Sequence, residues 1–255
     1  MKIISGGITA PQGFTANGVS CGIKRSGRPD LSLIVSKRLA VAAGVFTKNS
    51  IKAAPLIVSQ EHLRNGYAQA IITNSGNANC FTGELGIMYA KKTAEIFAAL
   101  LDLYPNDILV ASTGIIGKPL PFQKISDASF SLVKGLKKSG ATLAARGIMT
   151  TDLFPKEIAV EFRLAGKKVR IGACAKGSGM IQPNMATMLA YISTDVAINA
   201  KMLKAALKTA VDQTFNMITV DGCMSTNDMA VVLANGLAGN PPIEADGKNF
   251  QTFTQ

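Results

Sequence analysis

The segment KGSGMIQPNMATMLAYISTD, residues 176–195, places a threonine between a glycine-rich loop and a hydrophobic run that is typical of a buried strand. Thr187 follows Ala186 at the start of that run. A threonine hydroxyl can act as a nucleophile without a histidine when the residue is N-terminal, because its own α-amine takes the hydroxyl proton. The reference pKa of such an amine is about 7.7 to 8.0. This chemistry requires cleavage of the Ala186–Thr187 bond, whereas a threonine that starts a strand ordinarily has no such role.

A glycine-rich loop that opens with lysine also suggests phosphate binding, but the spacing excludes the usual motifs. In a Walker loop the lysine follows the second glycine and precedes Ser or Thr, whereas Lys176 precedes Gly177. The segment GVSCGIK, residues 18–24, fails the same spacing. A tight turn is the alternative explanation for these glycines. We therefore expect no nucleotide held by a phosphate loop.

The chain has one histidine, His62 in the segment SQEHLRNG, and we expect it to be an exposed residue at the start of a helix. A Ser-His-Asp or Cys-His mechanism would depend on this residue alone. Metal sites of the H-E-x-x-H type cannot form, and clustered acidic residues that would hold magnesium are few. The sequence therefore predicts no metal site, and an acyl-transfer enzyme would need another base.

The composition indicates a globular chain with a basic surface. Of its 255 residues, 47% are hydrophobic and 17% are charged, enough for one large domain or two modest ones. Lys and Arg number 27 against 16 Asp and Glu, a formal charge of +11, but they occur in separated pairs. With no Trp and four Tyr, the chain has few stacking platforms for nucleic acid. We therefore expect no nucleic-acid partner. The net positive charge would attract small anionic substrates or serve solubility alone.

The cysteines and the apolar segments bear on the cellular compartment. Cys21, Cys80, Cys174 and Cys223 lie far apart without a C-x-x-C pair, which argues against a zinc ribbon or a compact disulfide framework. We expect all four thiols to be reduced and buried. The N-terminal stretch MKIISGGITAPQGF is too weakly apolar for a secretory signal, and no later segment resembles a membrane span. These observations predict a cytoplasmic protein without a membrane partner.

Short β-branched runs in the first part of the chain predict a sheet. The runs are Leu31–Ser36, Val41–Thr47, Pro55–Ser59 and Ala68–Asn74. Residues 83–101 then carry apolar side chains at spacings of three and four, which predicts an amphipathic helix. The change of period indicates that helices and strands follow one another in this chain.

The second part continues the same mixture. Asp107–Val110 is a predicted strand that ends in the loop ASTGIIGKPLP, and Ile125–Leu136 is a predicted helix whose end is marked by Gly140. Two alternating runs around a short turn predict a hairpin over Ile158–Ala175. The remaining predicted elements are a strand at Met188–Ile192, a helix at Ala200–Gln213 and a strand at Met217–Val220. No linker or internal repeat divides the chain, so the class is mixed α/β or α+β.

The segment KGSGMIQPNMATML, residues 176–189, resembles the self-cleavage segment of the ornithine acetyltransferases, also called the bifunctional glutamate N-acetyltransferases of arginine biosynthesis. Other segments resemble this family in the expected order: GGITAPQGF, GIKRSGRPDLSLIVS, AAGVFTKN, NSGNAN (74–79), ASTGIIG (111–117), IMTTD (148–152) and TVDGCMSTND (219–228). The resemblance extends from Ser5 to about Gly239.

The resemblance implies a fold and a processing event. The fold would be a mixed α+β, layered sheet-and-helix sandwich of the self-cleaving N-terminal-threonine type. The precursor would cut itself between Ala186 and Thr187, so that residues 1–186 form an α chain and residues 187–255 the start of a β chain. Two α and two β chains would assemble into a heterotetramer.

The resemblance also implies a reaction. Thr187 would take the acetyl group from N2-acetyl-L-ornithine, release ornithine and pass the acetyl group to L-glutamate by a ping-pong route. The partners would then be small amino-acid substrates, with no cofactor and with acetyl-CoA as an alternative donor. Thr113 and Gly114 match the family's oxyanion-hole pair, although a tight turn after a strand would explain the same residues.

Lys176 and one threonine of IMTTD match the family's substrate contacts, and we choose Thr150 over Thr151 for that threonine. A lysine suits the carboxylate of an amino-acid substrate and would lower the pKa of a nearby amine. A solvated loop charge is the alternative role for Lys176.

The sequence also departs from the family. Family members are considerably longer and carry a substrate-binding Glu, and a terminal segment with an Asn and a Ser or Thr, beyond the point where this sequence stops. We therefore expect the chain to be C-terminally truncated, and residues 1–255 alone to show little or no transfer to glutamate. Unexpected residues occupy several matching positions: Cys80, Gln182, Met217, Cys223 and Met224.

Two other functions remain open from the sequence. One is a related self-cleaving aminopeptidase, in which water or an amine accepts the acyl group. The other is an inactive remnant or assembly subunit, kept folded by a partner that supplies the missing segment.

Overall fold

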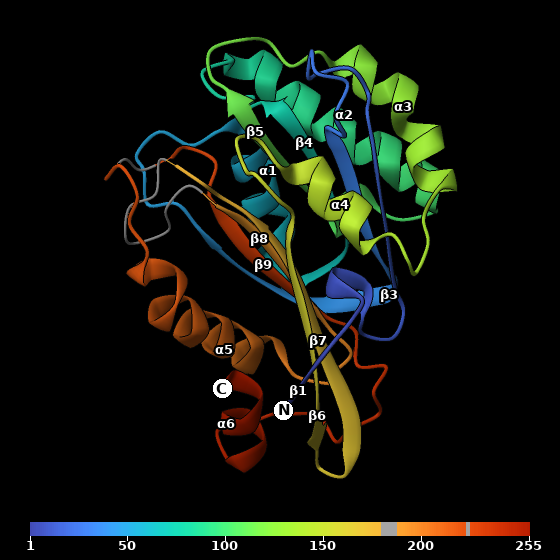
Figure 1. The fold of residues 1–255 in the computed structure, drawn as a ribbon, viewed down its shortest axis with the longest axis vertical. Coiled ribbons are helices and arrows are strands. Elements are labelled where there is room, and N and C mark those ends of the chain that lie inside the picture. Colours follow the sequence, from blue (N-terminus) through green and yellow to red (C-terminus); the bar gives the residue numbers. More distant parts are fainter. Residues whose placement is uncertain (180–187, 223–224) are drawn as a thin grey trace.

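Nine strands form one mixed sheet in the computed structural model, which describes residues 1–179, 188–222 and 225–255 (Figure 1). The strands are β1 (Lys2–Ile4), β2 (Phe14–Val19), β3 (Leu31–Phe46), β4 (Tyr67–Asn77), β5 (Ile108–Ile115), β6 (Lys156–Leu164), β7 (Lys167–Lys176), β8 (Leu189–Thr194) and β9 (Met229–Ala234). Their order is β1-β6-β7-β8-β9-β3-β4-β5, with β2 also paired to β3. The helices are α1 (Ala54–His62), α2 (Gly83–Leu101), α3 (Phe122–Lys134), α4 (Ala141–Ile148), α5 (Ala200–Gln213) and α6 (Lys248–Thr254).

Strand β3 connects the two halves of this sheet. Its first part, Leu31–Ser36, lies between β2 and β4, whereas its last part, Val41–Phe46, pairs with β9. The register with β4 shifts between Val35 and Ala40. Such a bulge bends a strand and increases its twist, which allows one long strand to serve two halves of a sheet.

The two halves pack face to face. Ile71 and Leu109 of the β4–β5 half share one buried cluster with Tyr191 and Val231 of the β8–β9 half. The Tyr191 hydroxyl, fully buried, lies 2.8 Å from the Thr73 hydroxyl, although β4 and β8 are not neighbours in the sheet. The interior is therefore a sheet-on-sheet core that β3 closes at one side.

Helices cover the outer face of each half (Figure 1). Side chains alternate along each strand, so Ile72 and Val110 point away from the central core and pack with α2 and α3. Ala230 and Val232 of β9 do the same against α5 and α6. The result is the layered sheet-and-helix sandwich that the sequence predicts.

Helices α2 and α5 have the predicted bounds because their apolar spacing is regular. In α5 the side chain of Asn199 accepts a hydrogen bond from the Met202 amide at 2.8 Å and starts the helix. Its buried residues recur at spacings of one, three and four: Met202, Leu203, Ala206, Leu207 and Val211. The predicted hairpin is also present as β6 and β7.

Several predicted elements are wrong. Pro55–Ser59 belongs to α1 and not to a strand, and Met217–Val220 forms no strand. Leu31–Ser36 and Val41–Thr47 are parts of one strand, β3, rather than two. The strand expected to end at Val110 continues to Ile115, and the helix expected to end at Gly140 ends at Lys134. The sequence patterns also gave no indication of α4, β1, β2 or β9.

Helix α1 covers the free edge of β5, which explains why this segment is helical. The Ser59 hydroxyl, fully buried, donates to the Val110 carbonyl at 2.7 Å and accepts from the Val110 amide at 2.8 Å. His62, expected to be exposed at a helix start, is instead a buried residue at the end of α1, and its Nδ1 lies 2.8 Å from the Ile108 carbonyl. Both side chains satisfy backbone groups that an edge strand would leave unpaired.

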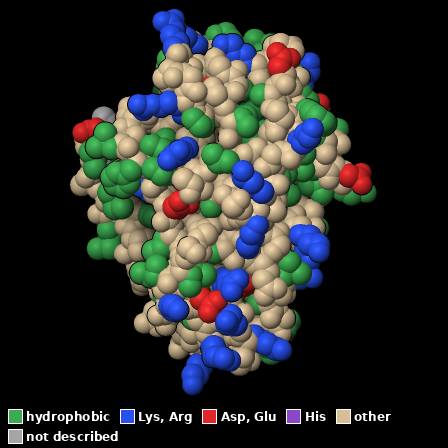
Figure 2. All heavy atoms as spheres, turned by 45° about the vertical axis from the view of Figure 1, so that its right-hand side comes forward, with side chains coloured by type: hydrophobic (Ala, Val, Ile, Leu, Met, Phe, Trp, Pro, Cys, Tyr) green, Lys and Arg blue, Asp and Glu red, His purple; other side chains and the backbone are tan. Residues whose placement is uncertain are grey.

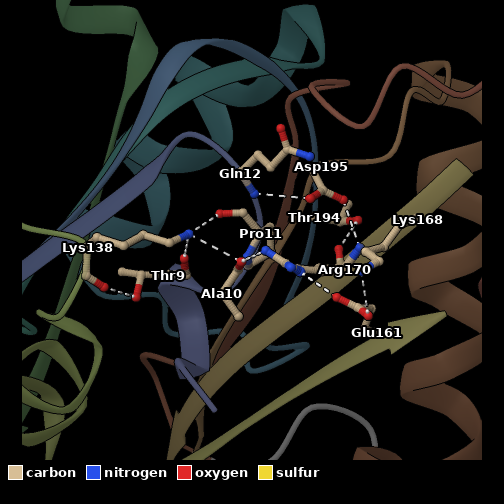
Figure 3. Close-up of polar contacts among 10 residues, drawn as sticks. All are labelled: Thr9, Ala10, Pro11, Gln12, Lys138, Glu161, Lys168, Arg170, Thr194 and Asp195. Carbon is tan, nitrogen blue, oxygen red and sulfur yellow. Dashed lines mark hydrogen bonds and ion pairs between the residues drawn. The ribbon is translucent and has the colours of Figure 1, made fainter. Parts of the chain in front are cut away.

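A polar cluster ties the N-terminal segment to the core (Figure 3). The Lys138 ammonium donates to the carbonyls of Thr9, Ala10 and Pro11. On the other side, the Asp195 carboxylate accepts from the amides of Gln12 at 3.0 Å and Arg170 at 2.8 Å. These bonds hold residues 9–12 between the loop before α4 and the far ends of β7 and β8.

The basic side chains are spread over the surface. Figure 2 shows Lys and Arg side chains from one end of the visible face to the other, with neutral surface between them. In the described parts of the chain, no helix combines the length and hydropathy that a bilayer crossing requires.

We expect Ser59→Ala to lower the free energy of unfolding by about 2 to 4 kcal/mol, because it leaves the buried amide and carbonyl of Val110 without partners. Ser131→Ala is the matched control, since Ser131 is an exposed helical serine whose hydroxyl bonds only to the Ala128 carbonyl among the described residues. Urea denaturation of both variants provides the comparison. Equal stabilities would show that α1 does not secure the β5 edge.

Candidate active site

A cleft of about 1080 Å³ opens at one end of the sandwich, between the two halves of the sheet. Its walls come from residues 23–26, the ends of β4, β5 and β7, the IMTTD turn and the loop before β9. Thr113, Gly114, Thr150 and Lys176 all line it, so the structure brings together these four predicted site residues. Ala186 and Thr187 lie outside the described residues.

Thr113 and Gly114 stand at the end of β5, within the strand rather than in the predicted loop. Thr113 is buried and Gly114 is exposed. Gly114 has a φ of 136°, and a Cβ there would lie 2.4 Å from the carbonyl carbon of Gly76 on β4. Only glycine fits this close parallel pairing, in which Gly76 and Gly114 are partners.

Asn227 joins the two halves of the sheet beside these residues. Its side-chain amide donates to the carbonyls of Ala78 and Ser112, both at 2.7 Å. Its own oxygen accepts from the Thr226 hydroxyl at 2.7 Å. The segment TVDGCMSTND contains this residue, but sequence reasoning gave it no role because the two carbonyls that its amide reaches are more than a hundred residues away.

The β4–β5 side continues the network. The Ser112 hydroxyl donates to the Asn74 side-chain oxygen at 2.6 Å, and the Asn74 amide donates to the Asn77 carbonyl at 2.9 Å. All three residues are buried. Since Ser112 precedes Thr113, this network fixes the backbone that presents the predicted oxyanion donors.

Lys176 ends β7 as a buried charge, 4% exposed, rather than a solvated loop charge. Its Nζ lies 3.4 Å from the Thr150 hydroxyl. Burial lowers the pKa of the Lys176 ammonium, while Asp152 and Asp228 favour its charged form. A buried ammonium at the wall of a cleft can pair with the carboxylate of a small ligand.

Asp152 shapes the turn that carries Thr150. Its carboxylate accepts from the amides of Thr150 at 3.2 Å and Gly177 at 2.9 Å, and from the Lys156 ammonium. Burial opposes its ionisation, but these hydrogen bonds hold the pKa of Asp152 below its usual value. The neighbouring Thr151 hydroxyl lies 2.5 Å from that of Ser178, so Thr150 alone of the two threonines contacts Lys176 among the described residues.

A second hollow of about 380 Å³ adjoins the cleft and shares Lys24 and Thr150 with it. Arg28 and Arg146 also line this hollow. Its three cationic side chains create a positive field at the side of the cleft, which favours anionic ligands.

In the described parts of the chain, the cysteines and acidic side chains form no second candidate site, either for a nucleophile or for a metal ion. Cys80 and Cys174 are buried free thiols and Cys21 is partly buried, while Cys223 lies outside the described residues. Burial raises the pKa of the Cys21 and Cys174 thiols to about 12, which makes both poor nucleophiles. Within the described ranges, no three His, Cys, Asp or Glu side chains gather as they would around a metal ion.

Comparison with known proteins decides the family. The sequence profile of the ArgJ family matches residues 15–255. The chain belongs to the ArgJ family. It is 48% identical over 255 residues to the arginine biosynthesis bifunctional protein ArgJ of Symbiobacterium thermophilum. The match covers 99% of this ArgJ-family chain but 63% of the relative, so the chain spans less than two thirds of that protein's length.

Two solved structures are similar to this ArgJ-family chain. The arginine biosynthesis bifunctional protein ArgJ of Bacillus halodurans is 37% identical with a TM-score of 0.67, and the match covers 72% of this chain and 98% of the other. The ornithine acetyltransferase of Mycobacterium tuberculosis, solved in complex with ornithine, is 38% identical with a TM-score of 0.66. That match covers 71% of this chain and 97% of the other. The resemblance to this family inferred from the sequence is confirmed.

We expect Gly114→Ala to destabilise the protein by about 3 kcal/mol, since a methyl group there meets β4 and the positive φ penalises any side chain. Gly117→Ala is the matched control, because Gly117 also has a positive φ of 77° but open space around it. The control should lose only about 1 kcal/mol. Thermal unfolding of both variants gives the comparison, and equal losses would mean that β4 does not constrain Gly114.

Proposed function

We propose that this ArgJ-family chain carries the nucleophile and the oxyanion donors of an enzyme that transfers an acetyl group from N2-acetyl-L-ornithine to L-glutamate through an acetyl-threonine intermediate on Thr187. One observation carries the proposal: Thr113, Gly114, Thr150 and Lys176 come from three separate segments of the chain and line one cleft. The residue after Thr187, Met188, is buried and directly precedes β8, beside the loop that holds Asn227. The nucleophile would thus join the cleft from a rigid strand.

Self-cleavage between Ala186 and Thr187 is the first step of the proposal. Residues 1–186 would form the α chain and residues 187–255 would belong to the β chain, with two copies of each in the assembly. The solved chains from the two relatives support this division. The matches cover 98% and 97% of the two solved chains but only 72% and 71% of this chain. These shares of this chain are close to the fraction of its 255 residues that precedes Thr187.

In the transfer itself, the Thr187 hydroxyl attacks the acetyl carbonyl while its α-amine takes the hydroxyl proton. The Thr113 hydroxyl and the Gly114 amide stabilise the oxyanion that develops. The amine of ornithine leaves with a proton, and the amine of glutamate then attacks the acetyl-threonine ester. Each oxyanion donor of this kind contributes about 2.7 to 4 kcal/mol of transition-state stabilisation.

The buried Lys176 ammonium would pair with the α-carboxylate of either amino acid, and the Thr150 hydroxyl would orient the same group. Lys176 has the charge for this task and low solvent competition. Use of acetyl-CoA as an alternative donor is a further part of the proposal. The hollow lined by Lys24, Arg28 and Arg146 offers the cationic surface that phosphate groups require.

Intact mass spectrometry tests the proposal. We expect two fragments divided at Ala186–Thr187, and we expect the smaller fragment to gain one acetyl group when N2-acetyl-L-ornithine is added. Thr187→Ala should remain one chain and gain no acetyl group, because it lacks the hydroxyl that attacks in both steps.

Thr187→Ser is the matched control, since it keeps a hydroxyl nucleophile and should be cut and acetylated. A folded wild-type chain that is never cut would contradict the processing step. Fragments that hydrolyse peptides without becoming acetylated by N2-acetyl-L-ornithine would instead favour the aminopeptidase alternative.

A further inference from the structure

The hollow of about 380 Å³ beside the cleft is lined by basic and apolar side chains. The basic ones are Lys24, Arg28 and Arg146, and the apolar ones are Pro29, Met149, Leu153 and Pro155. Among the described residues, no Asp or Glu lines this hollow. Such a lining suits an anion that carries a short apolar chain, as an aliphatic carboxylate does.

The three cations of the hollow lack an acidic partner. Five other Lys and Arg side chains form ion pairs with Asp or Glu, whereas Lys24, Arg28 and Arg146 form none in the part of the chain that the structure describes. The Lys24 ammonium donates instead to the neutral Pro29 carbonyl, at 2.7 Å. Burial lowers the pKa of Lys24, and the charge of Arg28 adds to this lowering although Asp30 opposes it. A bound anion would relieve the repulsion among these cations.

The carboxylates of Asp30 and Asp152 are already occupied. Asp30, fully buried, accepts from the amides of Cys21 at 2.6 Å and Lys24 at 2.8 Å, which fixes the loop between β2 and β3. Asp152 accepts from two amides and from the Lys156 ammonium. Both acids therefore hold the backbone around the hollow and leave its cations to a ligand.

Arg146 is presented by a fixed helix end. It lies in the last turn of α4, and the carbonyl of the next residue, Gly147, accepts from the buried Ser75 hydroxyl at 2.6 Å. A Cβ on Gly147 would lie 2.9 Å from the Leu31 carbonyl oxygen, so this helix end packs closely on β3. The side chains of Arg28 and Arg146 are exposed and form no hydrogen bond to the described residues. Both guanidinium groups are therefore available to a ligand.

Thr150 connects the hollow to the cleft, because it lines both. Its hydroxyl lies 3.4 Å from the Lys176 Nζ, and in the proposed function these two groups hold the α-carboxylate of the amino acid. The substituents of a tetrahedral Cα atom point in different directions. An amino acid bound in this way can direct its amine into the cleft and its side chain into the hollow.

We propose that this hollow is a specificity subsite in which Arg28 and Arg146 bind the side-chain carboxylate of a dicarboxylic amino-acid acceptor. The inference rests on the proposed function and names what distinguishes its acceptor, L-glutamate, from its product, L-ornithine. The same cations attract the glutamate carboxylate and repel the ornithine ammonium. Met149 and Leu153 would pack against the methylene groups between the two carboxylates.

The cations of the hollow also suit the phosphate groups of acetyl-CoA. Donor and acceptor occupy a ping-pong site in turn, so the two uses are compatible. The apolar part of the lining favours the acceptor, because phosphate oxygens gain nothing from contact with Met149 or Leu153. Acetyl-CoA therefore serves as a separate ligand in the test.

Binding of L-glutamate and L-glutamine, followed by NMR titration, tests the inference, because glutamine has nearly the same shape without the side-chain charge. We expect the wild-type protein to bind glutamate about 10-fold more tightly than glutamine. Arg28→Gln and Arg146→Gln should each weaken glutamate binding about 3- to 5-fold and leave glutamine binding unchanged. The double variant should lose the preference and bind L-ornithine more tightly than the wild-type protein does.

Arg163→Gln is the matched control. Arg163 is an exposed arginine near the turn of the β6–β7 hairpin, and its side chain bonds only to the Gly166 carbonyl among the described residues. This variant removes the same charge outside the hollow, so the preference for glutamate should remain. Thermal unfolding should show that all of these variants are folded, because exposed side chains of this kind contribute little to stability.

The possible results separate this inference from the proposed function. A wild-type protein that binds glutamate and glutamine equally, or a double variant that keeps the preference, would overturn the subsite. A double variant that loses only its affinity for acetyl-CoA would assign the hollow to phosphate groups and overturn the subsite as well. The proposed function fails instead if the wild-type chain is never cut or never acetylated, whatever its preference between glutamate and glutamine.

Discussion

One asparagine amide fastens the two halves of the sheet together at the cleft. Asn227 stands before β9, and its two amide hydrogens reach the carbonyls of Ala78 and Ser112 on the β4–β5 half. The walls of the cleft come from both halves, so their separation depends on this contact. Buried amide-to-carbonyl bonds of this kind set a distance more strictly than apolar packing does, because a small displacement leaves polar groups unpaired.

The rest of the fold supports that contact. Strand β3 continues from one half into the other, and the Tyr191–Thr73 pair marks where they meet in the core. Helix α1 secures the outer edge of β5 through Ser59, which leaves only the cleft end of that strand accessible. Rigid strands thus carry Thr113 and Lys176 to the cleft from opposite halves, and the glycine at 114 permits the closest approach of β4 and β5.

Local patterns predicted some elements well and others badly, for physical reasons. Helices α2 and α5 follow from their own apolar spacing, and the hairpin β6–β7 from its alternation. The run Pro55–Ser59 has the β-branched residues of a strand, but Ser59 and His62 are needed to cover β5, and that tertiary demand overrides the local preference. Strand β9 is a short run buried on both faces, so it shows no alternation. Helix α4 spans only eight residues, and its buried face is mostly alanine and glycine, which gives a weak apolar signal.

The sequence likewise predicted some residues of the candidate site and missed others. Thr113, Gly114, Thr150 and Lys176 were predicted through motifs that resemble a family, and the structure gathers them in one cleft. Their supports were not predicted, because the side chain of Asn227 bonds to carbonyls more than a hundred residues away, and Asp152 joins its own turn to Gly177 at the far end of the β6–β7 hairpin.

The claim that this single cleft binds and polarises an acetylated amino acid is tested most directly by a crystal structure of the protein with N2-acetyl-L-ornithine. The account predicts the acetyl oxygen within about 2.7 to 3.1 Å of the Thr113 hydroxyl and the Gly114 amide, with the α-carboxylate at Lys176. A ligand bound elsewhere, or one held in the cleft with its acetyl group away from Gly114, would contradict the account.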